Sequence, residues 1–566
     1  MFLEGFLQNV DFDSWNTFNL SKLNVDEALL NITSTFYNSV EVYFLSSDCA
    51  ECPYSYVCGV NKNNSQIIRS STKHHNFWRI YNSTNSTYKS VTNKESLVCE
   101  INTNIGEFGI YDFVINEKKC DVRIRKNPEN IYSPLIVTVI GLFLLYLLVK
   151  TVFNKWEKYY SKNNINISND REENSAVTEK RNERIKSVDV FRGFALCLMI
   201  FVNDGGGQYW FLNHSTWDGL YFADVLFPWF IWIMGVCIVL SQKSINRQPG
   251  KNLFILKRIL QRTVLLFFMG LSLNTLGIGP VNVSELRILG VLQRIAICYG
   301  ITSGINAFVR KLQINKSTTL NYLLIFLPQW LIYILIICFH CWLTFYLPVP
   351  GCPSGYLKAG GIQEDGMYRN CTGGATGYID KVIIGEKMLF QNAPVRNVYH
   401  TLQFDPENIL GSLTSIFQTF LGLQAGLVLI LLKKPSHRIY HFTCFGVILL
   451  IFGLILHFTK IIPLNKNLWS LSFVFVTSGL AFILFIAFYY IVDNVEIWNG
   501  SPFIYPGMNS ILVYVGHELC FQLFPWHWKV SKMNTHFINL LENVWGVIVW
   551  ILISFILYRK RIFISV

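Results

Sequence analysis

The sequence predicts an all-α polytopic membrane protein of about 11 transmembrane helices, preceded by a small β-rich N-terminal lumenal domain. Composition is the first reason, because 51% of the 566 residues are hydrophobic and only 15% are charged, whereas soluble domains carry about 25% charge. The mean hydropathy of +0.33 agrees. Uninterrupted apolar runs of about 18 or more residues, enough to cross a bilayer, are the second reason. A soluble enzyme, a disordered chain and a fibrous chain are therefore excluded.

Residues 1–133 differ from the rest in being polar and rich in cysteine and in N-glycosylation sequons. Alternating apolar and polar residues at Val42–Leu45 and Phe108–Ile115 favour short strands. The cysteines are Cys49, Cys52, Cys58, Cys99 and Cys120, and the sequons are at Asn19, Asn31, Asn63, Asn82 and Asn85. These features predict a glycosylated, disulfide-containing domain in an oxidising lumen.

Five cysteines leave one without a partner inside this segment. We expect it to pair with a cysteine of a later loop, Cys352 or Cys371, although sequence does not fix the connectivity. The Cys49-x-x-Cys52 spacing is interpreted as a structural disulfide rather than a redox or metal site.

Eleven apolar segments follow as predicted membrane helices. They are 133–153, 188–203, 220–241, 253–276, 287–309, 322–346, 409–432, 438–457, 468–492, 502–519 and 541–558. Alternate connecting segments hold 20 Lys and Arg residues on one side and 9 on the other. The positive-inside rule places the first set in the cytosol, so the N-terminal domain is lumenal and the C-terminal tail is cytosolic. Sequons at Asn166, Asn315 and Asn499 are then cytosolic and should be unmodified.

The predicted organisation has four parts. Residues 1–133 form the lumenal domain, 134–153 the first transmembrane helix, 154–187 a flexible cytosolic linker of mixed charge, and 188–566 a ten-helix domain with a long lumenal loop at 347–408. The first residues lack the basic and apolar regions of a signal peptide. Either the natural N-terminus precedes the chain shown, or the first membrane helix directs translocation.

Polar residues inside apolar segments are costly and are therefore functional candidates. Asp189 and Arg192 lie three apart on one helical face, either as a structural pair or at the rim of a cytosol-facing ligand site. Asn203 precedes Asp204 and the glycines 205–207, which end the helix and allow close approach of the backbone. This glycine run lacks the context of a phosphate-binding loop.

His214 follows in an aromatic-rich lumenal loop, where a structural role competes with proton transfer. The sequon at Asn213 would obstruct that loop and is predicted to be unused. Asp224 lies about one turn and Arg294 about two turns into their predicted helices, counted from the lumenal end. They form either an ion pair in the membrane or, if unpaired, leave Arg294 to bind a phosphate or carboxylate.

The loop at 347–408 is too long for a simple connector and is predicted to shape a lumenal substrate site, with a Cys352–Cys371 disulfide compatible with that role. Five later polar residues at helix ends are interpreted mainly as helix-packing groups. They are Asn465, Lys466, Asn467, Asn509 and His517.

From Arg184 to the C-terminus, about two thirds of the chain, the sequence resembles the heparan-alpha-glucosaminide N-acetyltransferase family of lysosomal multi-pass enzymes. The tracts that carry the resemblance, in order, are SVDVFRGFAL, FVN-x-GGGQYW, DGLYFADVLFPWFIWIMG, GVLQRI, LPVPGCPSGYL, NCTGGATGYID, FDPENILGS, NKNLWSLS and YPGMNSILVYVGHE. Their common order makes the resemblance far more specific than a single motif.

The resemblance implies transfer of acetyl from cytosolic acetyl-CoA, a co-substrate, to the amine of the non-reducing terminal glucosamine of heparan sulfate in the lysosomal lumen. It implies that His214 is catalytic, with Asn203 beside it. The histidine would act as general base with Asn203 binding the oxyanion, or would itself be acetylated. Candidates for the CoA phosphates are Arg192, Lys257, Arg258, Arg262 and, deeper in the membrane, Arg294.

We expect no permanently bound cofactor, and no metal site because no ligand spacing indicates one. We expect no nucleic-acid partner, because the basic residues are dispersed. Membrane lipids surround the protein, and a homodimer is left open. The alternatives are a secondary transporter using the same buried ionisable residues, a membrane acyltransferase acting on another glycan, and an adhesion role for the N-terminal domain.

Overall fold

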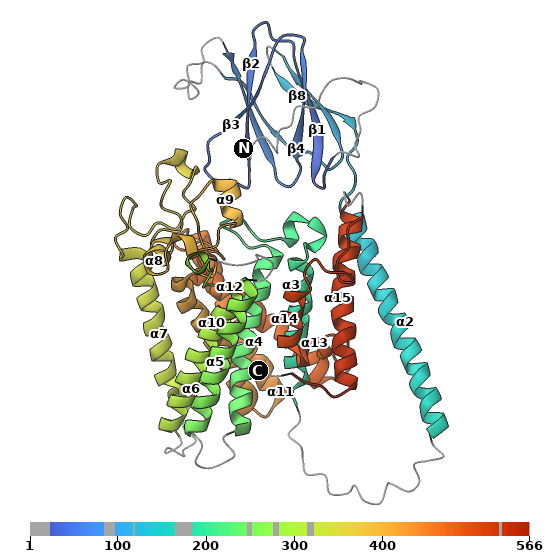
Figure 1. The fold of residues 1–566 in the computed structure, drawn as a ribbon, viewed down its shortest axis with the longest axis vertical. Coiled ribbons are helices and arrows are strands. Elements are labelled where there is room, and N and C mark those ends of the chain that lie inside the picture. The colour runs from blue at the N-terminus through green and yellow to red at the C-terminus, as the bar shows by residue number, and fades with distance from the viewer. Residues whose placement is uncertain are drawn as a thin grey trace, which may run out of the picture.

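The computed structural model describes residues 23–83, 97–116, 119–164, 184–245, 252–275, 282–313, 322–530 and 535–564. The molecule has two parts, which lie one above the other along its long axis (Figure 1). A sandwich of β-strands caps one end of a bundle of long helices. The predicted β-rich N-terminal segment and helical remainder are therefore confirmed as fold class.

The sandwich consists of two four-stranded sheets, of order β4-β1-β7-β8 and β3-β2-β5-β6. The strands are β1 (Glu27–Ser34), β2 (Val40–Ser46), β3 (Ser55–Val60), β4 (Ser65–Ser71), β5 (Asn76–Asn82), β6 (Leu97–Thr103), β7 (Ile110–Ile115) and β8 (Cys120–Lys126). Alternate residues point inward, as in β5, so that Trp78 and Ile80 meet Leu30 and Phe113 of the facing sheet in one apolar core. Pairing is antiparallel except between β1 and β7, which are parallel.

Each of the eleven predicted membrane segments is helical. The helices are α2 (Ser133–Asn164), α3 (Lys186–Asn203), α4 (Phe222–Ile245), α5 (Asn252–Asn274), α6 (Val291–Gln313), α7 (Tyr322–Tyr346), α10 (Ile409–Leu431), α11 (Pro435–Phe458), α12 (Leu471–Phe488) and α15 (His536–Arg559). The segment predicted at 502–519 is broken at Asn509 into α13 (Ile504–Met508) and α14 (Ser510–Leu519).

Among the described residues, seven helices are long and apolar enough to span a membrane, namely α2, α4, α7, α10, α11, α12 and α15. The predicted count of about eleven spans is therefore not confirmed. Helices α3 and α5 each carry three charged residues, which lowers their hydropathy. These two helices also carry four of the five arginines and lysines singled out from the sequence.

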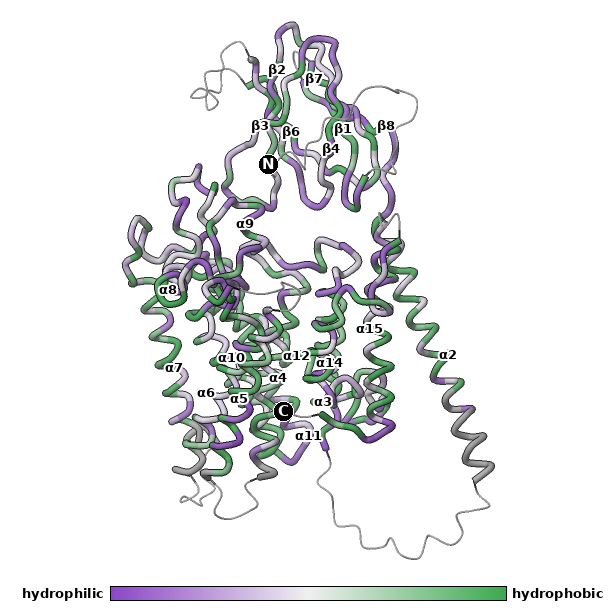
Figure 2. The backbone as a smooth tube through the Cα atoms, viewed as in Figure 1, coloured by the Kyte–Doolittle hydropathy of each residue, from purple (hydrophilic) through white to green (hydrophobic). Residues whose placement is uncertain are grey.

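The core helices approach closely through glycine. A Cβ at Gly235 of α4 would collide with the carbonyl of Thr419 in α10, and a Cβ at Gly422 of α10 would collide with that of Trp232 in α4. Small residues allow such close packing of membrane helices. Figure 2 shows the apolar colour concentrated along the helices. Helix α2 contacts the bundle at α15 and diverges from it toward the end away from the sandwich (Figure 1). Its apolar side chains, such as Ile136 and Phe143, are exposed, as lipid contact requires.

The connections at the β-sandwich end include both loops singled out from the sequence. The loop at 204–221 and the long connection containing α8 (Ala375–Ile383) and α9 (Pro394–Tyr399) lie beneath the sandwich (Figure 1). Thr216 donates to both carboxylate oxygens of Asp48, at 2.8 and 2.9 Å. The Tyr399 hydroxyl accepts from the Ala50 amide at 3.1 Å. The sandwich therefore rests directly on the loops that it covers.

Three disulfides join Cys49 to Cys52, Cys99 to Cys120 and Cys352 to Cys371. The interpretation of Cys49-x-x-Cys52 as a disulfide and the Cys352–Cys371 brace are confirmed. The expected link from the N-terminal segment to a later loop is wrong. Cys58 is instead a free thiol in the sandwich core, where it packs as an apolar side chain.

The asparagines of the predicted glycosylation sequons differ in their exposure to solvent. Asn63 is exposed, whereas Asn31 is buried in β1 and its amide donates to Asp112 at 2.8 Å. A glycan at Asn31 is therefore not compatible with this fold, which corrects that expectation. Asn19, Asn85, Asn166 and Asn315, and most of the predicted linker at 154–187, lie outside the described residues, although α2 continues to Asn164.

Candidate active site

A histidine–carboxylate pair lies at the sandwich end of the bundle. His214 Nδ1 is 2.8 Å from Asp224 Oδ1, and Asp224 is completely buried in the first turn of α4. The other oxygen of Asp224 accepts the backbone amides of Ser215 and Tyr221, at 3.1 and 2.9 Å. These bonds fix the carboxylate, which in turn fixes the imidazole. Nδ1 faces Asp224, so Nε2 is the ring nitrogen that the carboxylate does not hold.

Lys466 completes this cluster. Its Nζ lies 2.9 Å from His214 Nδ1, 3.2 Å from Nε2 and 3.9 Å from Asp224 Oδ1. Burial, followed by the neighbouring Lys466 ammonium, lowers the pKa of His214 from its ordinary value of 6.5, although Asp224 acts in the opposite direction. The imidazole is therefore kept unprotonated to a lower pH than a free histidine.

A pocket of about 340 Å³ opens beside His214. Its lining residues are Val202, Asn203, Asn213, His214, His517, Glu518 and Phe521. The structure thus brings together Asn203 and His214, the two residues that the sequence singled out for chemistry. Asn203 Nδ2 is 3.3 Å from His517 Nε2, and His517 Nδ1 lies 2.6 Å from the Tyr514 carbonyl, so the Asn203 amide is held toward the pocket by a neighbour from α14.

The glycine run makes the sharp turn between α3 and this pocket. All three glycines have positive φ, the conformation that glycine adopts most readily. The Gly207 amide donates to Asn543 of α15 at 2.7 Å. Asp204, next to Asn203, turns away from the pocket toward His527 at 3.3 Å, and burial raises the pKa of its carboxyl to about 7.

Of the basic residues predicted to bind CoA, Arg192 is held by two hydrogen bonds to oxygen. Its guanidinium donates to the Gly507 carbonyl at 2.6 Å and to Asp189 at 2.8 Å, which confirms the structural pair. Arg192 and Arg262 both lie within electrostatic reach of Cys237 in α4. Arg262 stacks on the Tyr299 ring at 4.6 Å and its Nε has no hydrogen-bond partner. Lys257 and Arg258 are exposed on α5.

The proposed Asp224–Arg294 ion pair is absent, because Asp224 is committed to His214. Arg294 is only 1% exposed, lies over the Trp469 ring at 4.5 Å and donates to the carbonyls of Pro406 and Asn408. These two bonds tie Arg294 to the start of α10. Its Nε and Nη1 are buried without a hydrogen-bond partner, so the binding of a phosphate by Arg294 stays a prediction.

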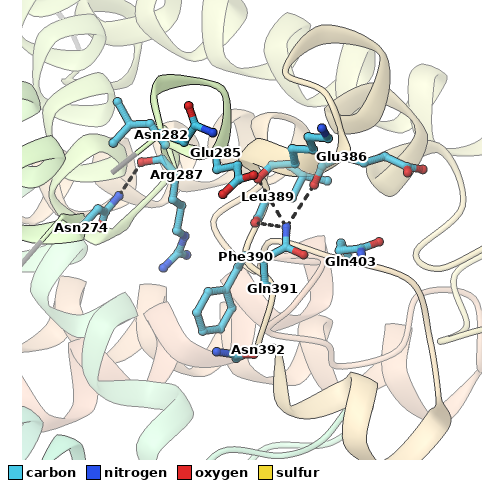
Figure 3. Close-up of a pocket in the computed structure, with 12 residues that line it drawn as sticks. Asn274, Asn282, Glu285, Arg287, Glu386, Leu389, Phe390, Gln391, Asn392 and Gln403 are labelled. Atoms are coloured by element: carbon cyan, nitrogen blue, oxygen red, sulfur yellow. Dashed lines mark hydrogen bonds between the residues drawn. The ribbon is translucent and has the colours of Figure 1, made fainter. Parts of the chain in front are cut away.

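A second pocket of about 680 Å³ lies on the same end, between the α5–α6 connection and the segment after α8 (Figure 3). Asn274, Gln391, Asn392 and Gln403 give it a polar lining. Its arginine, Arg287, is already paired with two carboxylates, Asp405 at 2.8 Å and Glu407 at 2.7 Å. Lys387, Glu285 and Glu386 also line it, so the pocket combines amide groups with charges of both signs.

Sequence reasoning missed two members of the site. Lys466 and His517 were both interpreted as helix-packing groups. Each lies more than 250 residues along the chain from its partner in the site. Both lie within tracts that carry the family resemblance, NKNLWSLS and YVGHE, which was the one signal that could have found them.

Fold and site together define a polytopic membrane protein with a histidine–carboxylate–lysine cluster in a pocket under a β-sandwich. Comparison with known proteins agrees. Residues 184–354 match the family model described as heparan-alpha-glucosaminide N-acetyltransferase, catalytic. The chain is 37% identical to the mouse heparan-alpha-glucosaminide N-acetyltransferase, over 96% of this chain and 89% of that protein. It is 36% identical to the human protein of the same name, over 96% of this chain and 88% of that protein. The chain belongs to the heparan-alpha-glucosaminide N-acetyltransferase family.

Proposed function

We propose that this chain acetylates the amine of the terminal glucosamine of heparan sulfate, using acetyl-CoA as donor and His214 as the catalytic base. The observation that carries the proposal is the pocket lined by both Asn203 and His214, with Asp224 fixed on the far nitrogen of the imidazole. Family membership supports the substrate pair. A secondary transporter would need no such oriented histidine–carboxylate pair beside this pocket.

The acceptor amine is an ammonium ion at acidic pH, so it must lose a proton before it can attack a thioester. His214 Nε2 takes that proton while Asp224 stabilises the resulting imidazolium through Nδ1. The amine nitrogen then forms a bond to the acetyl carbon and the carbon–sulfur bond breaks. The nitrogen gives its second proton to the leaving thiolate, which yields the acetamide and free CoA, and the imidazolium of His214 then releases the first proton to solvent.

Asn203 supplies the second group that the reaction needs. Negative charge develops on the acetyl oxygen during attack, and an amide N–H aimed into the pocket stabilises it. His517 holds the Asn203 amide in place from α14. Asn203 also ends α3, so its position is tied to a helix whose other end carries the basic residues.

Arg192 and Arg262 are proposed to hold phosphates of CoA. Arg192 lies eleven residues before Asn203 on α3, a rise of about 16 Å along the helix. A long pantetheine arm could run along α3 between the two positions. Arg262 Nε lacks a protein partner, which leaves a donor for an anionic ligand. Lys257 and Arg258 extend the same positive surface on α5.

The topology belongs to the same proposal. The sandwich, His214 and the loop at 347–408 are proposed to face the lysosomal lumen, with the tail after α15 in the cytosol. The excess of Lys and Arg on the alternate connections supports this orientation. The acetyl group is then taken up at one end of α3 and delivered at the other.

Acetyl transfer from labelled acetyl-CoA to glucosamine tests the assignment, with purified wild type compared with His214→Gln. We expect the variant to lose about 10²- to 10⁴-fold in rate, the usual contribution of a general base. Binding of acetyl-CoA should remain. His437→Gln is the control, since His437 is exposed at the start of α11, far along the chain from the site. Equal rates in all three proteins would contradict the assignment.

The covalent alternative predicts a different result in the same system. If His214 were acetylated, wild type incubated with labelled acetyl-CoA and no acceptor would accumulate one protein-bound label, and adding glucosamine would release it as product. With His214 acting as base, label appears in product only when both substrates are present.

A further inference from the structure

Three buried ionisable side chains meet where the sandwich touches the bundle. Asp26 and Glu107 come from loops of the sandwich, and His536 is the first residue of α15. All three are less than 10% exposed, and one ligand atom from each lies within 4.8 Å of the others. The cluster joins parts of the chain separated by about 500 residues, and the acetyl-transfer chemistry makes no use of it.

The hydrogen bonds around His536 determine which nitrogen carries a proton. His536 Nδ1 is 2.9 Å from the Gly207 carbonyl, which can only accept. Nδ1 must therefore be the N–H of the ring, and in the neutral imidazole Nε2 is a lone pair. That lone pair faces Asp26 Oδ1 at 3.2 Å and Glu107 Oε2 at 3.5 Å. With a neutral ring, three electron-rich atoms face one another, so the cluster needs either a proton on Nε2 or a bound cation.

The spacing favours a metal ion over a proton. A charge-assisted hydrogen bond from imidazolium to carboxylate is about 2.7–2.9 Å long, shorter than either distance here. Zn²⁺ binds nitrogen and oxygen ligands at about 2.0–2.2 Å, which places tetrahedral ligand atoms about 3.3–3.5 Å apart. The Nε2–Oδ1 and Nε2–Oε2 distances of 3.2 and 3.5 Å match this separation.

Neighbouring groups are arranged as an outer layer of such a site. Glu107 Oε1 accepts the Asp26 amide at 3.0 Å, and the Gly207 carbonyl orients the imidazole from behind. Tyr209 stacks on the imidazole with ring centroids 4.1 Å apart. Asp26 Oδ2 is buried and has no hydrogen-bond partner, and Lys73 Nζ approaches it only to 4.0 Å. One carboxylate oxygen thus remains available to the ion.

We propose that Asp26, Glu107 and His536 bind a divalent transition-metal ion of the Zn²⁺ class. An imidazole ligand excludes Ca²⁺ and Mg²⁺ as the preferred ions, because these favour all-oxygen sites. The ion would link two loops of the sandwich to α15 and, through Gly207, to the glycine turn beside the pocket. Its role is structural, because three protein ligands fix it outside the pocket lined by His214.

Metal content of the purified full-length protein tests the proposal. Wild type, Asp26→Asn, Glu107→Gln and a control, His75→Gln, are loaded with Zn²⁺, desalted and measured by mass spectrometry of the metal. His75 is an exposed histidine of the sandwich. We expect one equivalent of Zn²⁺ in wild type and control, and a loss of most of it in the two near-isosteric carboxylate variants. Co²⁺ loaded in place of Zn²⁺ should give visible absorption bands typical of tetrahedral coordination.

Equal Zn²⁺ content in wild type and both carboxylate variants would overturn the proposal, as would Co²⁺ that shows only the weak spectrum of the hydrated ion. In those cases the cluster is an ion triad around protonated His536. Should the variants fold poorly, wild type alone decides, since Zn²⁺ must raise its thermal unfolding temperature and a chelator must reverse the rise. None of these measurements uses acetyl transfer, so they are independent of the proposed function.

Discussion

At the scale of single residues, Lys466 has the clearest expected effect. Its ammonium helps to lower the pKa of His214, and a base must be neutral to act, so activity falls as the pH drops through that pKa. Lys466→Met removes the positive charge and leaves Asp224 to raise the pKa. The acid limb of kcat/KM should therefore move to higher pH, with about a tenfold loss at acidic pH for each whole pH unit of movement.

The matched control is Lys460→Met, which removes an exposed charge from the same α11–α12 connection. Its pH profile should follow wild type. An unchanged acid limb in Lys466→Met would show that Lys466 does not act on the base. Loss of activity to the same extent at every pH would indicate a role in positioning the substrate instead.

Asp224 acts through His214 rather than on the substrate. Asp224→Asn keeps the size of the side chain, but the amide neither stabilises an imidazolium nor fixes the tautomer with N–H on Nδ1. We expect kcat to fall by about 10²- to 10⁴-fold, as for the buried aspartate of a catalytic triad, with KM for acetyl-CoA unchanged. Steady-state kinetics check both values. A change confined to KM would place Asp224 in substrate binding.

The limits of sequence reasoning are clear at this scale. The residue types of Asn203 and His214, beside a glycine turn in a membrane protein, together with the family resemblance, indicated the site that the pocket now brings together. Asp224 was recognised as a buried ionisable group, but an ion pair with Arg294 was left as one of two alternatives, because sequence distance does not report which of several buried charges meet. Lys466 reaches His214 from 252 residues away, and no local pattern encodes such a contact.

At the scale of elements, the contact between α4 and α10 sets the stability of the bundle. Gly422→Ala places a methyl group on the backbone of Trp232, so the two helices must separate. Overpacking of this kind costs about 1–3 kcal/mol. Thermal unfolding in detergent should show a lower unfolding temperature for this variant.

Gly304→Ala in α6 is the control for that prediction, because a Cβ there meets no atom within 4 Å. Alanine favours a helix by about 0.8–1.0 kcal/mol over glycine, so this variant should be as stable as wild type or more so. An equal loss of stability in both variants would mean that helix propensity, not the α4–α10 contact, dominates.

The types of the elements were largely predictable. Long apolar runs in a polytopic chain form helices, because every backbone polar group in the membrane must have a hydrogen-bond partner. Helix α2 begins at the predicted residue, Ser133, and α7 spans the predicted 322–346. The break at Asn509 was not predicted, because its cause is tertiary. The Asn509 side chain bonds the backbone of Ile562 and Ile564 near the C-terminus, at 3.2 and 2.9 Å. The parallel pairing of β1 with β7 also joins segments far apart in the sequence, and the alternation of apolar and polar residues within each strand does not determine it.

At the scale of the whole molecule, the sandwich does more than cap the bundle. Asp48 holds the loop that carries His214 through Thr216, while Lys358 of the long connection forms ion pairs with Glu51 of the sandwich and with Glu364. The covered loops are thus fixed from both sides, by the membrane helices and by the sandwich. Sequence reasoning predicted both bodies and their order, but it could not predict this contact, since none of the paired residues shares a motif.

Two sequons at opposite ends of the molecule test the proposed orientation. Asn63 lies in the sandwich and Asn499 in the connection between α12 and α13, and both are exposed, so accessibility does not distinguish them. Only a lumenal asparagine meets the glycosylation machinery. We expect Asn63→Gln to remove one glycan from the protein expressed in animal cells, and Asn499→Gln to change nothing.

Glycopeptide mass spectrometry reads both sites in one sample, and Asn31→Gln serves as a buried control that should leave the glycan pattern unchanged. The two sequons must be read together. A glycan on Asn63 alone places the sandwich and His214 in the lumen, and therefore the acetyl acceptor with them. A glycan on Asn499 alone would invert the molecule, and the basic surface of α5 would then face the lumen, where the proposed binding of cytosolic acetyl-CoA by Arg192 and Arg262 could not occur.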